Sequence, residues 1–434
     1  MKKLMALALA AMLLLSLAGI AAAEEKVSIT MWTYPIGGWG KSESVDEIIA
    51  AFNEKHPNIS VQVEYLDYQS GDDQVTTAIE AGTTPDIIME GPERLVSNWG
   101  AKGKMLPLND LWTEEALKDI SAVSEAVVSA CKSPDGNYYE YPLCMTTHCT
   151  AINYDLFEKA DALQYLDQET RTWTTENFEK AMKALKDSGV PVTGVVYCGG
   201  QGGDQGTRAL AMNLYSASFT DPEHTQYTMN SEAGIKGLQK LQDMVNEGTL
   251  NADAAIVASD ELQMFANGTF AMSFAWNASN ASNYASSVNF KPFAMAFPSD
   301  DGVPELAGGI WGFGIFDNKD EAKAAAAKEF IKFVADDPVQ GPKSVYATGF
   351  FPVRASFGDI YTGTEKESFK DFLVFMPYLG DYYNVTPNWA VQRTEWWNML
   401  QRIFAGGDVA AEVNTYVANS NAAIATYVNN ANAK

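Results

Sequence analysis

Residues that could bind a substrate occur in short stretches, each directly after a segment that favours β-strand. A sugar ring has an apolar face of C–H groups and a rim of hydroxyls. It therefore needs a flat aromatic surface beside hydrogen-bond donors and acceptors. The stretches MWTYPIGGWG and EGPER supply both kinds of group in the first quarter of the chain. Their candidate ligand contacts are Trp32, Tyr34, Trp39, Glu90, Glu93 and Arg94.

Further candidates follow strand-like or glycine-rich segments in the second half of the chain. They are Gln201, Asp204, Trp276, Asn277 and Trp311. The adjacent pair Trp396 and Trp397 lies in a helical pattern. At most one of the two can face a cleft, because neighbouring helix residues point in different directions. We expect Trp396 to be the ligand contact and Trp397 to pack in the core.

Each candidate also has a purely structural interpretation. The aromatic rings could belong to the hydrophobic core, where large rings are usually buried. The acids of EGPER could stabilise the N-terminus of a helix through its dipole. These alternatives stay open from the sequence.

Metal and phosphate chemistry have weaker support. The cluster CMTTHC (144–149) has no spacing typical of structural zinc. The glycine-rich YCGGQGGDQGTR (197–208) lacks the lysine that ends a phosphate-binding loop. We therefore expect no metal and no cofactor.

Two other functions fit aromatic residues beside acids. A secreted glycoside hydrolase would place two carboxylates around the scissile bond, but no stretch carries a distinctive signature of such an enzyme. An aromatic cage near acids could instead hold a quaternary ammonium ligand. We expect a binding protein rather than an enzyme, and the ammonium ligand remains an alternative.

Composition and targeting signals restrict the setting. Residues 1–23 have a basic start, an apolar stretch and small residues before Glu24, as in a cleavable signal peptide. Since no cysteine lies near that cleavage site, a lipid anchor is not expected, and the location would be periplasmic or extracellular. The formal net charge of −25 argues against nucleic-acid and anionic-membrane partners. The four cysteines do not form the framework of a disulfide-rich protein.

Hydrophobic periodicity predicts an α/β protein with a parallel sheet. Strand-like runs at 26–32, 59–66 and 85–90 alternate with helical patterns at 42–58 and 74–84. A β-α-β-α-β order implies parallel strands covered by helices. Ligands of such sheets bind outside the carboxyl ends of the strands, where the first candidates lie.

The order of eight motifs resembles a known family. Among them are AIEAGTTPDIIM, YYEYPLCMTTHCTAINYDLFEKA, MFANGTFAMSFAW and AAAKEFIKFVAD before GFFPVR. Across nearly the whole chain after the leader, this order is similar to the carbohydrate-binding family of extracellular solute-binding proteins of ABC importers, which includes maltose-binding protein.

The resemblance implies a two-lobe periplasmic-binding-protein fold with a hinge and a ligand cleft between the lobes. The first lobe would comprise 24–143 and 291–347, and the second 144–290 and 348–434. It also implies that Glu93 and Arg94 match an acid–arginine pair that binds sugar hydroxyls. The expected protein is a monomer that captures a sugar, in particular an oligosaccharide. It would deliver the sugar to ABC permease subunits by closing its lobes.

Overall fold

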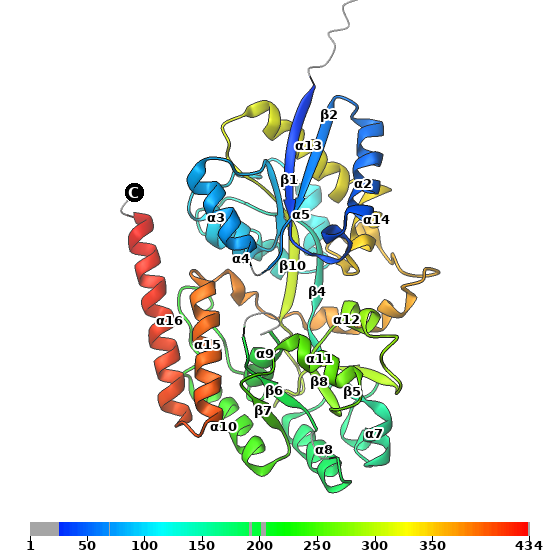
Figure 1. Cartoon of the computed structure of the whole chain (residues 1–434), viewed down its shortest axis with the longest axis vertical. Coiled ribbons are helices and arrows are strands. Elements are labelled where there is room, and N and C mark those ends of the chain that lie inside the picture. Colours follow the sequence, from blue (N-terminus) through cyan, green and yellow to red (C-terminus); the bar gives the residue numbers. More distant parts are fainter. Residues whose placement is uncertain (1–25, 69, 191–192, 201–204, 433–434) are drawn as a thin grey trace, which may run out of the picture.

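The chain forms two lobes, each built around its own hydrophobic core (Figure 1). The computed structural model describes residues 26–68, 70–190, 193–200 and 205–432. The leader predicted over 1–23 lies outside these residues, as do the candidates Gln201 and Asp204. In the part of the chain that is described, no helix is both long and apolar enough to cross a membrane.

The first lobe contains a six-stranded sheet in the order β11-β4-β10-β3-β1-β2. The strands β1, β2 and β3 run parallel, as the β-α-β-α-β pattern predicted, whereas β10 runs antiparallel to both β3 and β4. The bounds are β1 (Val27–Thr33), β2 (Ile59–Tyr65), β3 (Ile87–Glu90), β4 (Tyr141–Thr147), β10 (Gly308–Ile315) and β11 (Phe351–Pro352).

Helices cover this sheet because their apolar residues recur at helical spacing. In α2, Val45, Ile48 and Phe52 form one buried stripe. The helices of this lobe are η1 (Gly37–Gly40), α2 (Ser42–Lys55), α3 (Gly71–Ala81), α4 (Pro92–Arg94), η2 (Leu95–Gly100), α5 (Glu114–Ser121), α6 (Glu125–Ala130), α13 (Glu321–Ala335) and α14 (Gln340–Thr348).

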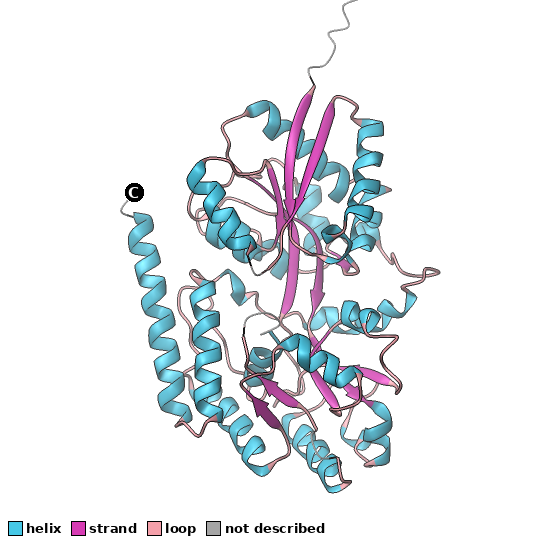
Figure 2. Cartoon of the chain, in the orientation of Figure 1, coloured by secondary structure: helices cyan, strands magenta, loops and turns pink. Residues whose placement is uncertain are grey.

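The second lobe has two smaller sheets, ordered β8-β5-β9 and β6-β7. Their strands are β5 (Cys149–Asn153), β6 (Val195–Tyr197), β7 (Asn251–Asp253), β8 (Met272–Trp276) and β9 (Pro292–Met295). Helices surround them (Figure 2). These are α7 (Tyr154–Lys159), η3 (Leu163–Tyr165), α8 (Thr175–Asp187), α9 (Gln205–Asn213), α10 (Glu232–Glu247), α11 (Ala258–Ala266), α12 (Ala278–Asn283), α15 (Trp389–Phe404) and α16 (Val409–Asn432).

The chain passes between the two cores three times. Met145 belongs to the first core and Cys149 to the second, and the chain returns between Ala307 and Ile310. It leaves again after Val353 through the irregular elements η4 (Ala355–Phe357), η5 (Glu367–Tyr378) and η6 (Tyr383–Val385). This arrangement confirms the predicted two-lobe α/β class.

The second crossing differs from the boundary expected at 290/291. Strand β9 pairs with β5, and Ala294 to Phe297 pack in the second core. Residues 292–297 therefore lie in the second lobe, not in the first as expected. The hydrophobic alternation predicted the strand but could not tell which of the two sheets it joins.

All four cysteines, Cys131, Cys144, Cys149 and Cys198, are buried free thiols. They contribute to packing rather than to covalent cross-links.

Candidate functional site

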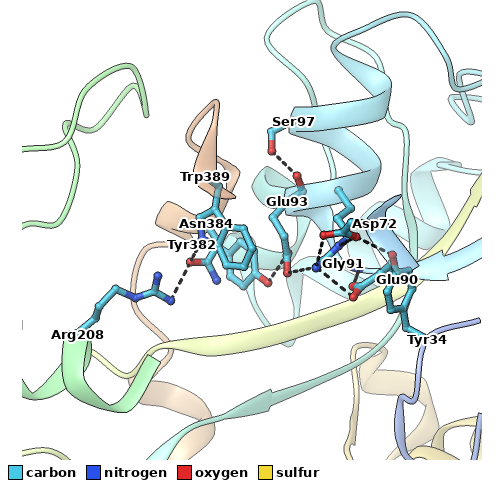
Figure 3. Close-up of polar contacts among 11 residues, drawn as sticks. Tyr34, Asp72, Glu90, Gly91, Glu93, Ser97, Arg208, Tyr382, Asn384 and Trp389 are labelled. Carbon is cyan, nitrogen blue, oxygen red and sulfur yellow. Dashed lines mark hydrogen bonds and ion pairs between the residues drawn. The ribbon is translucent and has the colours of Figure 1, made fainter. Parts of the chain in front are cut away.

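Arg94 lies at the centre of a polar network to which both lobes contribute residues. Figure 3 labels its partners Asp72, Glu90, Glu93 and Trp389. Arg94 follows β3 in the single-turn helix α4 and is 7% exposed. Its Nε and Nη2 donate to the two carboxylate oxygens of Asp72, at 2.7 and 3.0 Å. Its Nη1 lies 3.2 Å from Glu90 Oε1 and 3.7 Å from Glu93 Oε1. This fork-to-carboxylate geometry fixes the guanidinium in one orientation.

Aromatic rings enclose the same guanidinium. Its Cζ lies 5.2 Å from the Tyr34 ring centroid and 5.8 Å from those of Tyr68 and Trp389. Tyr34 stacks on Tyr68 at 5.1 Å, and its hydroxyl donates to Asp72 Oδ1 at 2.6 Å. Tyr34 and Tyr68 come from the first lobe, whereas Trp389 begins α15 of the second. Arg94 is therefore contacted from both lobes.

A cavity of about 180 Å³ opens beside this network. The first lobe contributes acids, an arginine, amide and hydroxyl groups and a lysine, and α15 contributes an aromatic ring. The lining residues are Asp72, Glu93, Arg94, Ser97, Asn98, Lys102, Asn388 and Trp389. The walls thus combine an apolar ring with many hydrogen-bonding groups, as a polar ligand with one apolar face requires.

Two of the lining residues, Ser97 and Asn98, lie on the π-helical turn η2. Such turns are rare and occur frequently at functional sites. The Ser97 hydroxyl donates to the Glu93 carbonyl at 3.0 Å, which ties η2 to α4.

Several carboxyl groups lie close to Arg94 and to one another. Burial raises the pKa of Glu90 to about 7, against the charge of Arg94, and the charge of Glu93 adds to the rise. Burial opposes ionisation of Asp72, but the hydrogen bonds and charge of Arg94 outweigh it and lower the pKa of that carboxyl. Burial, together with the carboxylates of Glu93 and Glu90, raises the pKa of the fully buried Glu140 well above its ordinary value. Asp72 is thus ionised at neutral pH and can accept hydrogen bonds from a ligand.

The segment before α15 completes the network. The Tyr382 hydroxyl donates to Glu93 Oε2 at 3.1 Å, and Trp389 Nε1 donates to Asn384 Oδ1 at 3.0 Å. Figure 3 shows this segment lying beside the acids of the first lobe.

Four of the sequence candidates converge on this network: Tyr34, Glu90, Glu93 and Arg94. Of these, Glu93 and Arg94 line the cavity. Tyr34 and Glu90 lie behind them, at 0% and 1% exposed. The pair expected from EGPER therefore lies where a ligand could reach it, while its two neighbours support it.

The remaining candidates of the first lobe lie elsewhere. Trp39 is fully buried, packs edge-on against Phe313 at 5.2 Å and donates through Nε1 to the Ser344 carbonyl at 3.0 Å. Trp32 is partly buried in an open groove beside α3, outside the cavity. Trp311 stacks on Phe350 at 4.6 Å near a crossing between the lobes. None of the three is among the residues that line the cavity.

The candidates of the second lobe have structural partners. Trp276 is 2% exposed and packs against Phe265, and Asn277 Oδ1 accepts from Asn280 N at 2.8 Å, which caps α12. Trp396, expected at the cleft, is fully buried, and its Nε1 donates to Thr207 Oγ1 at 3.2 Å. Both members of the pair Trp396 and Trp397 are thus core residues.

Sequence reasoning did not select several residues of the network. They are Asp72, Tyr382, Asn384, Asn388 and Trp389. A signal for Trp389 exists in NWAVQR, an aromatic residue directly before a helical pattern, but the same pattern also fits a core residue. The described residues contain no group of three or more His, Cys, Asp or Glu side chains arranged to hold a metal ion.

Comparisons with known proteins give a consistent picture. The sequence model of the family described as bacterial extracellular solute-binding protein matches residues 38–341. An arabinooligosaccharide-binding protein of Bacillus subtilis (strain 168) is 26% identical over 388 residues, which cover 86% of this chain and 85% of that protein.

Solved structures share the fold at low sequence identity. An ABC substrate-binding protein from Listeria monocytogenes in complex with cycloalternan is 20% identical with a TM-score of 0.69, covering 93% of this chain and all of that one. The sugar-binding protein MalE from Xanthomonas citri is 17% identical with a TM-score of 0.72, covering 92% and 98%. These matches confirm the two-lobe solute-binding fold.

Proposed function

The chain belongs to the bacterial extracellular solute-binding proteins, and on that premise we propose that it captures an oligosaccharide and delivers it to an ABC permease. The ligand would bind between the lobes, at the cavity bounded by Arg94 and Trp389. Contacts from both lobes would stabilise the closed arrangement that a permease recognises.

The observation that carries this proposal is the composition of the cavity. The Trp389 ring supplies an apolar surface from the second lobe, and Asp72, Glu93 and Arg94 supply oriented donors and acceptors from the first. Sugar hydroxyls both donate and accept, so they match such a mixed set, whereas an apolar ligand would take these groups out of water and offer them no hydrogen bond in return. The arabinooligosaccharide-binding relative and the cycloalternan complex support an oligosaccharide as the ligand class.

The quaternary ammonium alternative has less support. An aromatic cage beside acids does exist here, but the guanidinium of Arg94 occupies it. A ligand cation would have to displace a charge that Asp72 holds through two hydrogen bonds.

A hydrolase is also disfavoured. Glu90 and Glu93, two carboxyls of the network, both engage Arg94, and Tyr382 engages Glu93 in addition. Their placement serves to orient the guanidinium rather than to flank a bond. We propose a binding protein that leaves its ligand chemically unchanged.

Location and oligomeric state are part of the same proposal. We propose a periplasmic or extracellular location after removal of the leader, with a monomer as the working form. Size-exclusion chromatography with light scattering checks the monomer.

A sugar panel tests the proposed function. Protein stripped of co-purified ligand is titrated by calorimetry with arabino-oligosaccharides, malto-oligosaccharides and cyclic glucans, and with choline as the competing class. The proposal expects saturable binding of at least one oligosaccharide and no heat from choline. Binding of choline alone, or of no sugar in the panel, would overturn it.

A further inference from the structure

A short segment between η5 and α15 contacts both lobes through neighbouring residues. The Tyr382 hydroxyl donates to Glu93 of the first lobe at 3.1 Å. The next ring, Tyr383, packs against Phe219 in the core of the second lobe at 4.6 Å. The backbone at Tyr382 and Tyr383 is thus held by both lobes. A few residues later the chain reaches Asn388 and Trp389, which line the cavity.

Asn384 is the polar residue at the centre of this segment. It is 5% exposed, and its Oδ1 accepts from Trp389 Nε1 at 3.0 Å. The Nη2 of Arg208 lies 3.5 Å from the same oxygen. Arg208 belongs to α9 and is fully buried, with its guanidinium over the rings of Phe219 and Tyr383. Figure 3 shows Arg208, Asn384 and Trp389 in one line that leads toward the acids.

Trp389 needs such a restraint because of its position. It is the first residue of α15, after Asn388 in the left-handed conformation (φ 62°), and it borders open space in the cavity. Arg393, one turn later, lies over the face of the ring, with its guanidinium carbon 4.3 Å from the ring centroid. The hydrogen bond to Asn384 acts at the edge of the ring, where it holds the indole nitrogen and so restricts rotation of the ring about its side-chain torsions.

We propose that Asn384 is the positioning residue of the ligand site, holding the Trp389 ring in the orientation in which it meets the sugar. This inference rests on the proposed function for its effect on affinity, but not for its effect on the ring. The neutral amide oxygen serves two donors at once, one on the cavity wall and one in the core of the second lobe. Through these two contacts, Asn384 links Arg208 of α9 to the Trp389 ring.

Two substitutions separate positioning from bulk. Asn384→Leu keeps the size of the side chain and removes the acceptor, whereas Asn384→Asp keeps an acceptor for the indole N–H and for Arg208. Losing one hydrogen bond from a nearly buried site should weaken oligosaccharide binding about 5-fold in Asn384→Leu. Asn384→Asp should stay within about 2-fold of the parent protein.

Repeating Asn384→Leu in a Trp389→Phe background makes the test specific. Phenylalanine retains an aromatic ring but has no N–H, so it cannot form the hydrogen bond to Asn384. Asn384→Leu should then change affinity by less than about 2-fold, a non-additivity that a double-mutant cycle measures. An equal loss in both backgrounds would overturn the proposal.

A ligand-free measurement keeps this test independent of the proposed function. Solvent exchange of the Trp389 indole proton is followed by NMR on indole-labelled protein, with the signal assigned by its disappearance in Trp389→Phe. Exchange should be slow in the parent protein and in Asn384→Asp, and at least about 5-fold faster in Asn384→Leu. Unchanged exchange in Asn384→Leu refutes the positioning role even if sugar binding is established. If exchange is faster in Asn384→Leu but the parent protein binds no sugar, Asn384 still orients the Trp389 ring, and it is the proposed function that is refuted.

Discussion

Two tryptophans with opposite environments allow one prediction to be worked out in full. Trp39 is fully buried in the first lobe, packed on Phe313 and bonded through its indole N–H to the Ser344 carbonyl. Trp389 lines the interlobe cavity and is only partly buried. Truncation of each to alanine should therefore affect different properties of the protein.

Trp39→Ala should lower stability and leave ligand affinity unchanged. Replacing a fully buried tryptophan by alanine costs about 3–5 kcal/mol of unfolding free energy. For a unit of about 200 residues, 1 kcal/mol corresponds to about 2–4 °C, so Tm should fall by about 6–20 °C. Since native domains have about 5–15 kcal/mol of stability, most of the protein should still be folded at 25 °C, where its Kd should lie within about 2-fold of the parent value.

Trp389→Ala should do the reverse. Loss of a central aromatic contact typically costs at least about 2 kcal/mol of binding, about 30-fold in Kd, while Tm should change by only a few degrees. Differential scanning calorimetry gives the Tm values and isothermal titration gives the Kd values. Two results would show that our division into core and site residues is wrong. One is a Trp39→Ala protein that loses affinity and keeps its Tm, and the other is a Trp389→Ala protein that keeps its affinity and loses Tm.

Three further predictions concern the network around Arg94 and a second buried carboxyl, Glu261 of α11, which accepts hydrogen bonds from Ser273 and Phe274. Arg94→Lys should weaken ligand binding by at least about 10-fold in calorimetry, because lysine cannot form the two-point contact with Asp72; a change under 2-fold would contradict this role. Tyr382→Phe should weaken binding by about 2- to 10-fold, since Glu93 loses a donor that orients it; Tyr138→Phe is the control, because Tyr138 stacks on Trp112 and is not among the residues that line the cavity. The unfolding free energy should fall as pH rises from about 5 to 8, because burial raises the pKa of Glu90 to about 7 and of Glu261 to about 8. Both carboxyls keep their protons in the folded state but lose them near pH 4.5 once unfolded, so rising pH favours unfolding. In Glu261→Gln the fall in unfolding free energy between pH 5 and pH 8, measured by urea titration, should be smaller by about 1–3 kcal/mol. A variant whose unfolding free energy depends on pH as in the parent protein would contradict the raised pKa of Glu261.

Much of the fold could be predicted from local sequence patterns. The β-branched runs of β1 and β2 and the apolar stripe of α2 are local, and the parallel pairing follows from their order. The side of the cleft on which Glu93 and Arg94 lie could also be predicted, because they come directly after a parallel strand.

The rest depends on contacts between distant segments. Asp72 joins the site because Arg94 reaches it from another helix, and Trp389 joins because η6 brings α15 against the first lobe. In the sequence, Trp39 and Trp396 cannot be told apart from a tryptophan that contacts a ligand, because the residue type is the same and the neighbouring residues are comparable. Their complete burial and their hydrogen bonds to Ser344 and Thr207 identify them as core residues. Strand β9 has the pattern of an edge strand in either lobe, and its pairing with β5 decides its place.

The most direct test of the account is an affinity measurement on one protein and two variants. Stripped protein, Asp72→Asn and Trp389→Ala are titrated with the best-binding neutral oligosaccharide of the panel. These substitutions remove one group from each lobe, so each alone should raise Kd by at least about 10-fold. An oligosaccharide that binds the parent protein and both variants with the same Kd would show that the sugar lies somewhere other than between Arg94 and Trp389.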